Sequence, residues 1–224
     1  MNNTILYLTH SLVKDGPVNN VEEYLMKILV IGGTGTLGKA VIQELSADHE
    51  IVTAGKTRGD FQVDITDENS VKALFQSTGK VDAIIATTGS LHFGPLVEMT
   101  AAQFNIGLQN KLLGQVRLAL IGQSFLNDGG SITLTSGIIA DEPIRQGANA
   151  TTVNAAVEGF VRGAAIELSR GIRINVVSPT VVEESLKAYG PFFPGFEAAP
   201  AARVAKAYRR SVEGAQTGRV YKVW

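Results

Sequence analysis

The chain has 224 residues, a length that one globular α/β domain can reach. Hydrophobic residues make up 45% and charged residues 18%, a balance that is typical of a globular protein and excludes a disordered chain. Its formal net charge of −1 gives no electrostatic reason to expect a nucleic acid or a membrane as partner, and no apolar run approaches the roughly 18 residues of a spanning helix. The absence of cysteine excludes disulfides, thiolate catalysis and cysteine metal sites, and it fits a cytoplasmic protein.

Residues 1–25 precede the first predicted strand. The segment 4–13 is mildly apolar but lacks the basic start and the small-residue cleavage site of a signal peptide. We interpret residues 1–25 as an appended or loosely docked extension and residues 26–224 as a single nucleotide-binding domain.

The first predicted strand is the short apolar, β-branched run 28–31, and a glycine-rich turn and a helix follow it. In this setting the glycine spacing favours dinucleotide binding over a structural turn, because it allows a tight turn, close approach of a pyrophosphate and close helix packing. Amide groups at the helix start would receive the phosphate charge. The predicted phosphate contacts are Gly32, Gly33, Thr34, Gly35, Thr36, Leu37 and Gly38.

The second predicted strand, 51–54, leads into a basic turn with Lys56 and Arg58 and no acidic residue. An acidic side chain at this place binds the ribose 2′-hydroxyl of NAD, whereas a basic one accommodates the 2′-phosphate of NADP. We therefore predict NADP(H) as the preferred coenzyme, with NAD(H) possible and a solvated loop as the alternative. A short strand at 61–64 ends in Asp64, which either contacts the adenine edge or caps the next turn, and Ile65 is a further expected coenzyme contact.

The remaining pattern alternates strands with helices. Further strands are predicted at 83–86, 131–134, 173–177 and 219–223, and further helices at 67–75, 101–126, 153–168 and 201–212. The segment 183–200 is rich in proline and aromatic residues and is interpreted as a flap. This order predicts an α/β fold with a Rossmann-type doubly wound parallel sheet of about seven strands, in which ligands bind at the carboxyl ends of the strands. The expected contacts there are Ala86, Thr87, Thr88, Gly89, Ser136, Pro179, Thr180 and Val181.

From about residue 27 onward the chain resembles the short-chain dehydrogenase/reductase family. The glycine motif is similar to that of the extended and atypical branches, and residues 86–89 stand where members carry N-N-A-G. Residues 132–136 resemble the strand that delivers the catalytic serine, and 155–160 the run after Y-x-x-x-K. Residues 173–179 resemble R-V-N-x-V-x-P-G, with Thr180 replacing the glycine. The resemblance implies the fold and a nicotinamide coenzyme.

The resemblance also implies an altered catalytic set, because Ala150 stands at the position of the tyrosine and Asn154 at that of the lysine. Three residues before Gly114, where members carry asparagine, this chain has Lys111. The same exchange is familiar in ketoreductase domains of polyketide synthases. We therefore expect Ser136, Lys111 and Asn154 to form the catalytic set, with the Lys111 ammonium near the nicotinamide ribose. The alternative is a surface lysine and a helix-capping asparagine.

Without a phenol at position 150, the proton donor stays open among Lys111, His92 and Tyr189. One hypothesis is an NADP(H)-dependent oxidoreductase that acts on a small carbonyl or alcohol with a modified proton relay. The other is a catalytically inactive NADP(H)-binding sensor or regulatory protein, and a purely structural subunit has no positive support. The resemblance further implies a homodimer or homotetramer that associates through the helices at 101–126 and 150–169.

Overall fold

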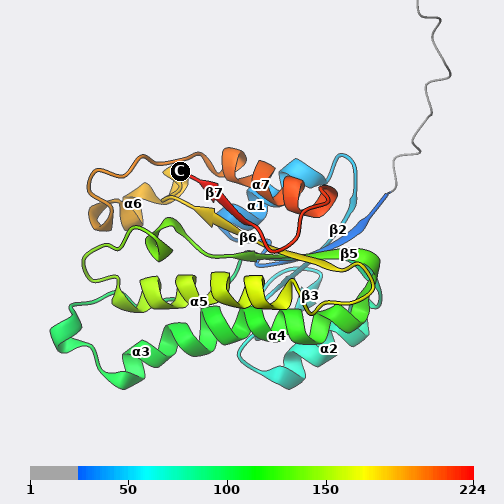
Figure 1. Cartoon of the computed structure of the whole chain (residues 1–224), viewed down its shortest axis with the longest axis horizontal. Helices are drawn as coiled ribbons and strands as arrows, with labels where there is room; N and C mark the ends of the chain where they lie inside the picture. The colour runs from blue at the N-terminus through cyan, green and yellow to red at the C-terminus, as the bar shows by residue number, and fades with distance from the viewer. Residues whose placement is uncertain (1–24) are drawn as a thin grey trace, which may run out of the picture.

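The computed structural model describes residues 25–224, so nearly all of the extension predicted at 1–25 lies outside the described residues. These residues form one sheet of seven parallel strands in the order β3-β2-β1-β4-β5-β6-β7, with helices on both faces (Figure 1). The predicted α/β doubly wound fold is therefore confirmed. Within 25–224, no helix combines the length and apolar character needed to cross a membrane.

The inner strands are nearly continuous apolar runs because both of their faces are covered. The bounds are β1 Lys27–Ile31, β2 Glu50–Gly55, β3 Phe61–Gln62, β4 Val81–Ala86, β5 Leu126–Thr135, β6 Arg173–Pro179 and β7 Val220–Val223. Val30 of β1 pairs with Thr53 of β2 and with Ile85 of β4. This parallel register brings all carboxyl ends to one edge of the sheet.

The helices divide into two layers (Figure 1). The longer ones are α1 Thr36–Leu45, α2 Glu68–Thr78, α3 Ala101–Gly107, α4 Leu113–Gly122, α5 Ala148–Ala164 and α7 Ala201–Glu213. The short ones are η1 Leu96–Glu98, η2 Leu108–Leu112, η3 Gln123–Phe125, η4 Ile138–Ala140, η5 Glu183–Ser185, α6 Leu186–Tyr189 and η6 Gly190–Phe192. One core cluster lies under α2, α4 and α5, and a second lies under α1 and α7.

Local sequence signals account for several boundaries. Asp67 caps α2, where its carboxylate accepts the amide hydrogen of Asn69 at 2.9 Å, and an acidic residue follows in the first turn as predicted. Thr100 and Gln103 form a reciprocal capping box at the start of α3. These caps satisfy amide groups that would otherwise have no partner at the helix start.

The structure corrects two predicted boundaries. The helical region predicted at 101–126 is interrupted by the short π-helix η2. It ends at Phe125, because Leu126 already pairs with Val81 at the start of β5. That strand begins five residues earlier than residue 131, since its polar, glycine-containing start resembles a loop in sequence. The helix predicted to reach 168 ends at Ala164, although Leu168 still packs against the core.

Candidate coenzyme and catalytic site

The glycine turn between β1 and α1 has the geometry of a phosphate cradle. Gly32 adopts φ +90°, and a Cβ there would lie 2.7 Å from the main-chain oxygen of Thr87. A Cβ on Gly38 would lie 2.2 Å from the main-chain oxygen of Gly32, so the helix can pack this closely only with glycine. Gly35 caps α1 without a side-chain bond, and the first helical bond runs from the Lys39 amide. The amides of Thr36, Leu37 and Gly38 in the first turn of α1 are thus available to an anion, whereas the Gly35 amide donates to the main-chain oxygen of Gly32 at 3.0 Å.

A second hollow lies beside the turn after β2, among Lys56, Asp64, Ile65 and Thr88. The Asp64 carboxylate accepts the amide and hydroxyl hydrogens of Thr66 and pairs with Lys56 Nζ at 2.9 Å. These Thr66 bonds and Lys56 hold the pKa of Asp64 at about 2. Asp64 therefore caps the next turn, the second of its two predicted roles, while Arg58 lies exposed nearby.

Asp60 lies two residues after Arg58 and was not among the predicted site residues. Its carboxylate accepts the amide hydrogen of Thr53 at 2.8 Å and the hydroxyl hydrogen at 2.7 Å, bonds that lower its pKa. Its position just after the basic residues is the signal that could have revealed it. Asp60 thus fixes the loop that carries Lys56 and Arg58.

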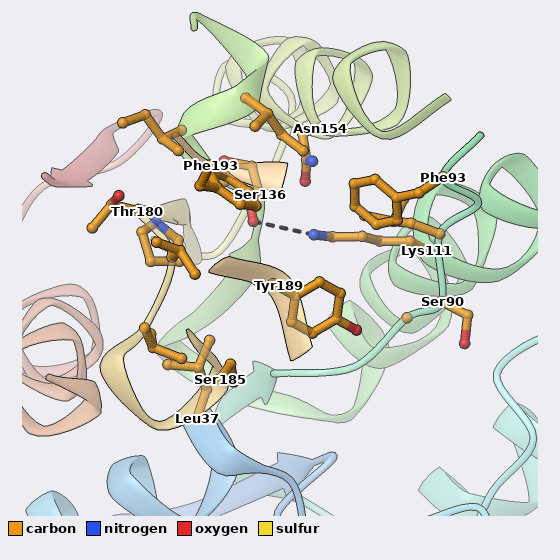
Figure 2. Close-up of a pocket in the computed structure, with 18 residues that line it drawn as sticks. Leu37, Ser90, Phe93, Lys111, Ser136, Asn154, Thr180, Ser185, Tyr189 and Phe193 are labelled. Carbon is orange, nitrogen blue, oxygen red and sulfur yellow. Dashed lines mark hydrogen bonds between the residues drawn. The ribbon is translucent and has the colours of Figure 1, made fainter. Parts of the chain in front are cut away.

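A cavity of about 420 Å³ lies at the carboxyl ends of the strands (Figure 2). Predicted site residues from six places along the chain line it: Leu37, Gly89, Lys111, Ser136, Asn154, Pro179, Thr180 and Val181. The sequence did not indicate its apolar wall, which is formed by Leu91, Phe93, Ile138, Ile139, Val182 and Phe193. The cavity thus combines a few polar groups with a mostly hydrophobic lining, which is the usual composition of a small-molecule site.

Lys111 projects into this cavity from the short π-helix η2. It is 8% exposed, and its Nζ donates to the main-chain oxygen of Ser136 at 3.1 Å (Figure 2). A Cβ on Gly89 would lie 2.6 Å from the Lys111 Cα, so this glycine allows β4 and η2 to meet. Among residues 25–224 no carboxylate forms an ion pair with it, and burial lowers its pKa to about 8. The surface-lysine alternative is therefore wrong.

Ser136 lies beside Lys111 at the end of β5, and a buried carboxylate holds its hydroxyl group. Ser136 Oγ donates to Glu158 Oε1 at 2.7 Å, and Glu158 is 5% exposed. The guanidinium of Arg162 lies 3.8 Å from the other carboxylate oxygen. The sequence reasoning missed Glu158, although it follows Asn154 by one helical turn and interrupts the apolar face of α5.

Asn154 and Ala150 lie on the same face of α5 but have different surroundings. Asn154 Nδ2 donates to the main-chain oxygen of Ala150 at 2.8 Å, so this amide bonds its own helix rather than Lys111. Asn154 Oδ1 is buried and has no partner among the described residues. Ala150 is buried behind Ile138 and Ile139, with which it packs, and is not itself among the residues that line the cavity.

The two loop residues considered as proton donors are placed differently. Tyr189 lines the cavity, and its ring centroid lies 6.1 Å from that of Phe93. His92 is absent from the cavity lining, and its amide donates to Asn149. The geometry therefore gives no support to His92 as a donor.

Comparison with known proteins supplies the family. A family model described as "Enoyl-(Acyl carrier protein) reductase" matches residues 36–221. The chain belongs to the short-chain dehydrogenase/reductase family. This membership confirms the predicted resemblance and makes the chain a protein of NAD(P)-dependent oxidoreductase type.

Several known proteins are similar to this chain over most of their length. The structure of the protein lin1944 from Listeria innocua is 52% identical with a TM-score of 0.88, and the match covers 89% of this chain and all of that one. A small-chain dehydrogenase in complex with NADPH is 29% identical with a TM-score of 0.80, over 89% of this chain and 97% of that chain. The 3-oxoacyl-[acyl-carrier-protein] reductase MabA from Mycobacterium tuberculosis is 28% identical over 71% of this chain and 70% of its own.

Proposed function

We propose that this chain is an NADP(H)-dependent oxidoreductase that interconverts a small carbonyl compound and its alcohol without a tyrosine at position 150. The observation that carries the proposal is Lys111, a buried cation with no carboxylate partner among the described residues, on the wall of a mostly apolar cavity. A buried uncompensated charge is costly, and groups with strongly perturbed pKa values in clefts are candidates for function.

The residues present fit a nicotinamide dinucleotide. The first turn of α1, from Thr36 to Gly38, has amides for the pyrophosphate, and the exposed Lys56 and Arg58 follow β2, where a basic side chain would accommodate a 2′-phosphate. Leu37 and the segment 179–181 line the cavity, where they would hold the nicotinamide. The NADPH complex of the 29% identical relative supports the choice of NADP(H). When bound, the nicotinamide supplies or accepts a hydride.

In this proposal the chain binds and orients the reactants with few groups. Two N–H groups of Lys111 are left after its bond to Ser136, and they would donate to the ribose hydroxyls of a bound coenzyme. The buried free oxygen of Asn154 accepts from a hydroxyl or a water beside them. Ser136 contacts the substrate oxygen. The apolar wall excludes water and favours a small neutral substrate, and the flap at 183–200 contributes Tyr189 and Phe193 to that wall.

A second candidate function is a non-catalytic NADP(H) sensor. It is favoured by one observation, that Ala150 has no proton to give and the hydrogen of the Ser136 hydroxyl is already donated to Glu158. In this case the same residues bind the coenzyme and a partner protein reads the complex.

The experiment follows NADPH oxidation with benzaldehyde, acetophenone, cyclohexanone and 9,10-phenanthrenequinone, after NADPH binding has been titrated by fluorescence. Turnover of at least one carbonyl that Ser136→Ala lowers by about 10²-fold or more supports the enzyme. NADPH binding without turnover across the panel supports the sensor. Failure to bind either coenzyme contradicts both functions.

A further inference from the structure

We propose that the carboxyl group of Glu158 holds the proton for this site and exchanges it with the substrate oxygen through the hydroxyl group of Ser136. Glu158 is thus a positioning residue that replaces the missing phenol as the source of the proton. The inference rests on the proposed oxidoreductase function and supplies the proton donor that this function lacks.

The contacts around Ser136 carry the argument. Lys111 Nζ donates to its main-chain oxygen at 3.1 Å, and its own hydroxyl donates to Glu158 Oε1 at 2.7 Å (the first contact is shown in Figure 2). Ser136 therefore lies between a buried cation and a buried carboxyl group. With its hydrogen on the Glu158 side, the Ser136 oxygen presents lone pairs to the cavity that it lines.

This arrangement has a defined chemistry in both directions. During oxidation of an alcohol, its hydroxyl proton moves to Ser136 Oγ while the Ser136 hydrogen moves to Glu158 Oε1. The C–H electron pair leaves as the hydride that NADP⁺, the required oxidant, accepts. During reduction of a carbonyl by NADPH, a protonated Glu158 returns its hydrogen to Ser136, which protonates the substrate oxygen. Serine alone is too weak an acid for this role, so the carboxyl group is essential.

Of the charged groups on α5 and on the elements packed against it, one cation lies close to Glu158. Arg162 of the same helix lies 3.8 Å from Glu158 Oε2, and its side chain is 58% exposed. On neighbouring elements, Lys111 bonds Ser136, Arg117 of α4 bonds the Ile65 main chain, and Arg173 of β6 bonds the Ser211 main chain. The last of these groups, Asp128 of β5, pairs with Arg170. Among these groups, Arg162 is therefore the one cation within ion-pair distance of Glu158.

A structural role would need only a hydrogen bond between α5 and β5, and the side-chain amide of glutamine preserves that bond. Glu158→Gln tests the difference, because glutamine keeps the shape but carries no exchangeable acid. With the best carbonyl of the panel, we expect turnover to fall by about 10²–10⁴-fold while NADPH binding stays within about twofold. The relay predicts that this variant changes the pH profile of turnover, whereas a purely structural hydrogen bond predicts that the profile stays the same. Glu167→Gln is the matched control, because Glu167 is exposed and lies three residues beyond the end of α5 at Ala164.

Arg162→Gln provides a second measurement if Glu158→Gln does not fold. This variant removes the cation 3.8 Å from Glu158 Oε2, so the relay predicts that the pH profile of turnover changes here too. The inference is overturned if Glu158→Gln keeps the wild-type turnover and pH profile, if Arg162→Gln leaves the pH profile unchanged, or if Tyr189→Phe alters the profile as Glu158→Gln is expected to. If the wild type turns over a substrate and any one of these results is found, the relay is overturned but the oxidoreductase function is not. Absence of turnover by the wild type overturns the oxidoreductase, and the relay with it.

Discussion

Burial of the Lys111 ammonium predicts an effect on stability that can be measured without knowing the substrate. Burial lowers its pKa from the ordinary 10.5 to about 8, so between these values the unfolded chain binds a proton that the folded chain does not. At about 1.4 kcal/mol per pKa unit, the shift corresponds to a cost of about 3 kcal/mol in the free energy of unfolding below pH 8. This cost disappears progressively as the pH rises from 8 to 10.5.

Lys111→Met removes the charge and keeps most of the side-chain volume. We expect the stability difference, variant minus wild type, to be larger at pH 7 than at pH 10.5 by about 3 kcal/mol. Urea unfolding at a series of pH values measures this difference directly. Lys206→Met, on the exposed face of α7, is the matched control and changes no buried group.

A difference between Lys111→Met and wild type that stays flat from pH 7 to pH 10.5 would refute the buried ammonium. A confirmed difference would mean that the folded protein retains a destabilising group. If the variant also binds NADPH more weakly, the same ammonium group lowers the stability of the fold and strengthens coenzyme binding.

Three further predictions concern the coenzyme site and the fold. Replacing both Lys56 and Arg58 by alanine should weaken NADPH binding about tenfold more than NADH binding, measured by fluorescence titration, and equal losses would refute the 2′-phosphate assignment. Gly38→Ala should abolish NADPH binding because its Cβ meets main-chain atoms at 2.2 Å, whereas Gly159→Ala, with no atom within 4 Å, should raise the free energy of unfolding by about 0.5–1 kcal/mol. Asp67→Ala should lower the free energy of unfolding by about 1 kcal/mol through loss of the α2 cap, and no change in urea unfolding would contradict the capping bond.

The sequence predicted most of the framework because the relevant signals are local. Buried strands such as 28–31 are short apolar runs, glycines at Gly32 and Gly38 are required by backbone contacts, and Asp67 marks a helix start. The parallel order then places distant residues at one edge of the sheet. Lys111 and Ser136 could be paired in this way, with help from the family resemblance.

The remainder depends on contacts between elements that local patterns do not encode. The early start of β5 is set by pairing of Leu126 with Val81, and the polar residues that follow it resemble a loop. The hydrogen bond between Glu158 and Ser136 joins residues from different elements, and a lone glutamate on a helix is usually a solvated residue. Association through the helices at 101–126 and 150–169 and a cytoplasmic location stay predictions.

The most direct test of the central claim uses Trp224, the single tryptophan of the chain. Trp224 packs against the cluster of Ile138 and Ile139, two residues that line the cavity. If a reduced nicotinamide binds there, exciting Trp224 should produce saturable emission from NADPH, and Lys111→Met should weaken this binding. No energy transfer from Trp224 at millimolar NADPH or NADH would contradict the account.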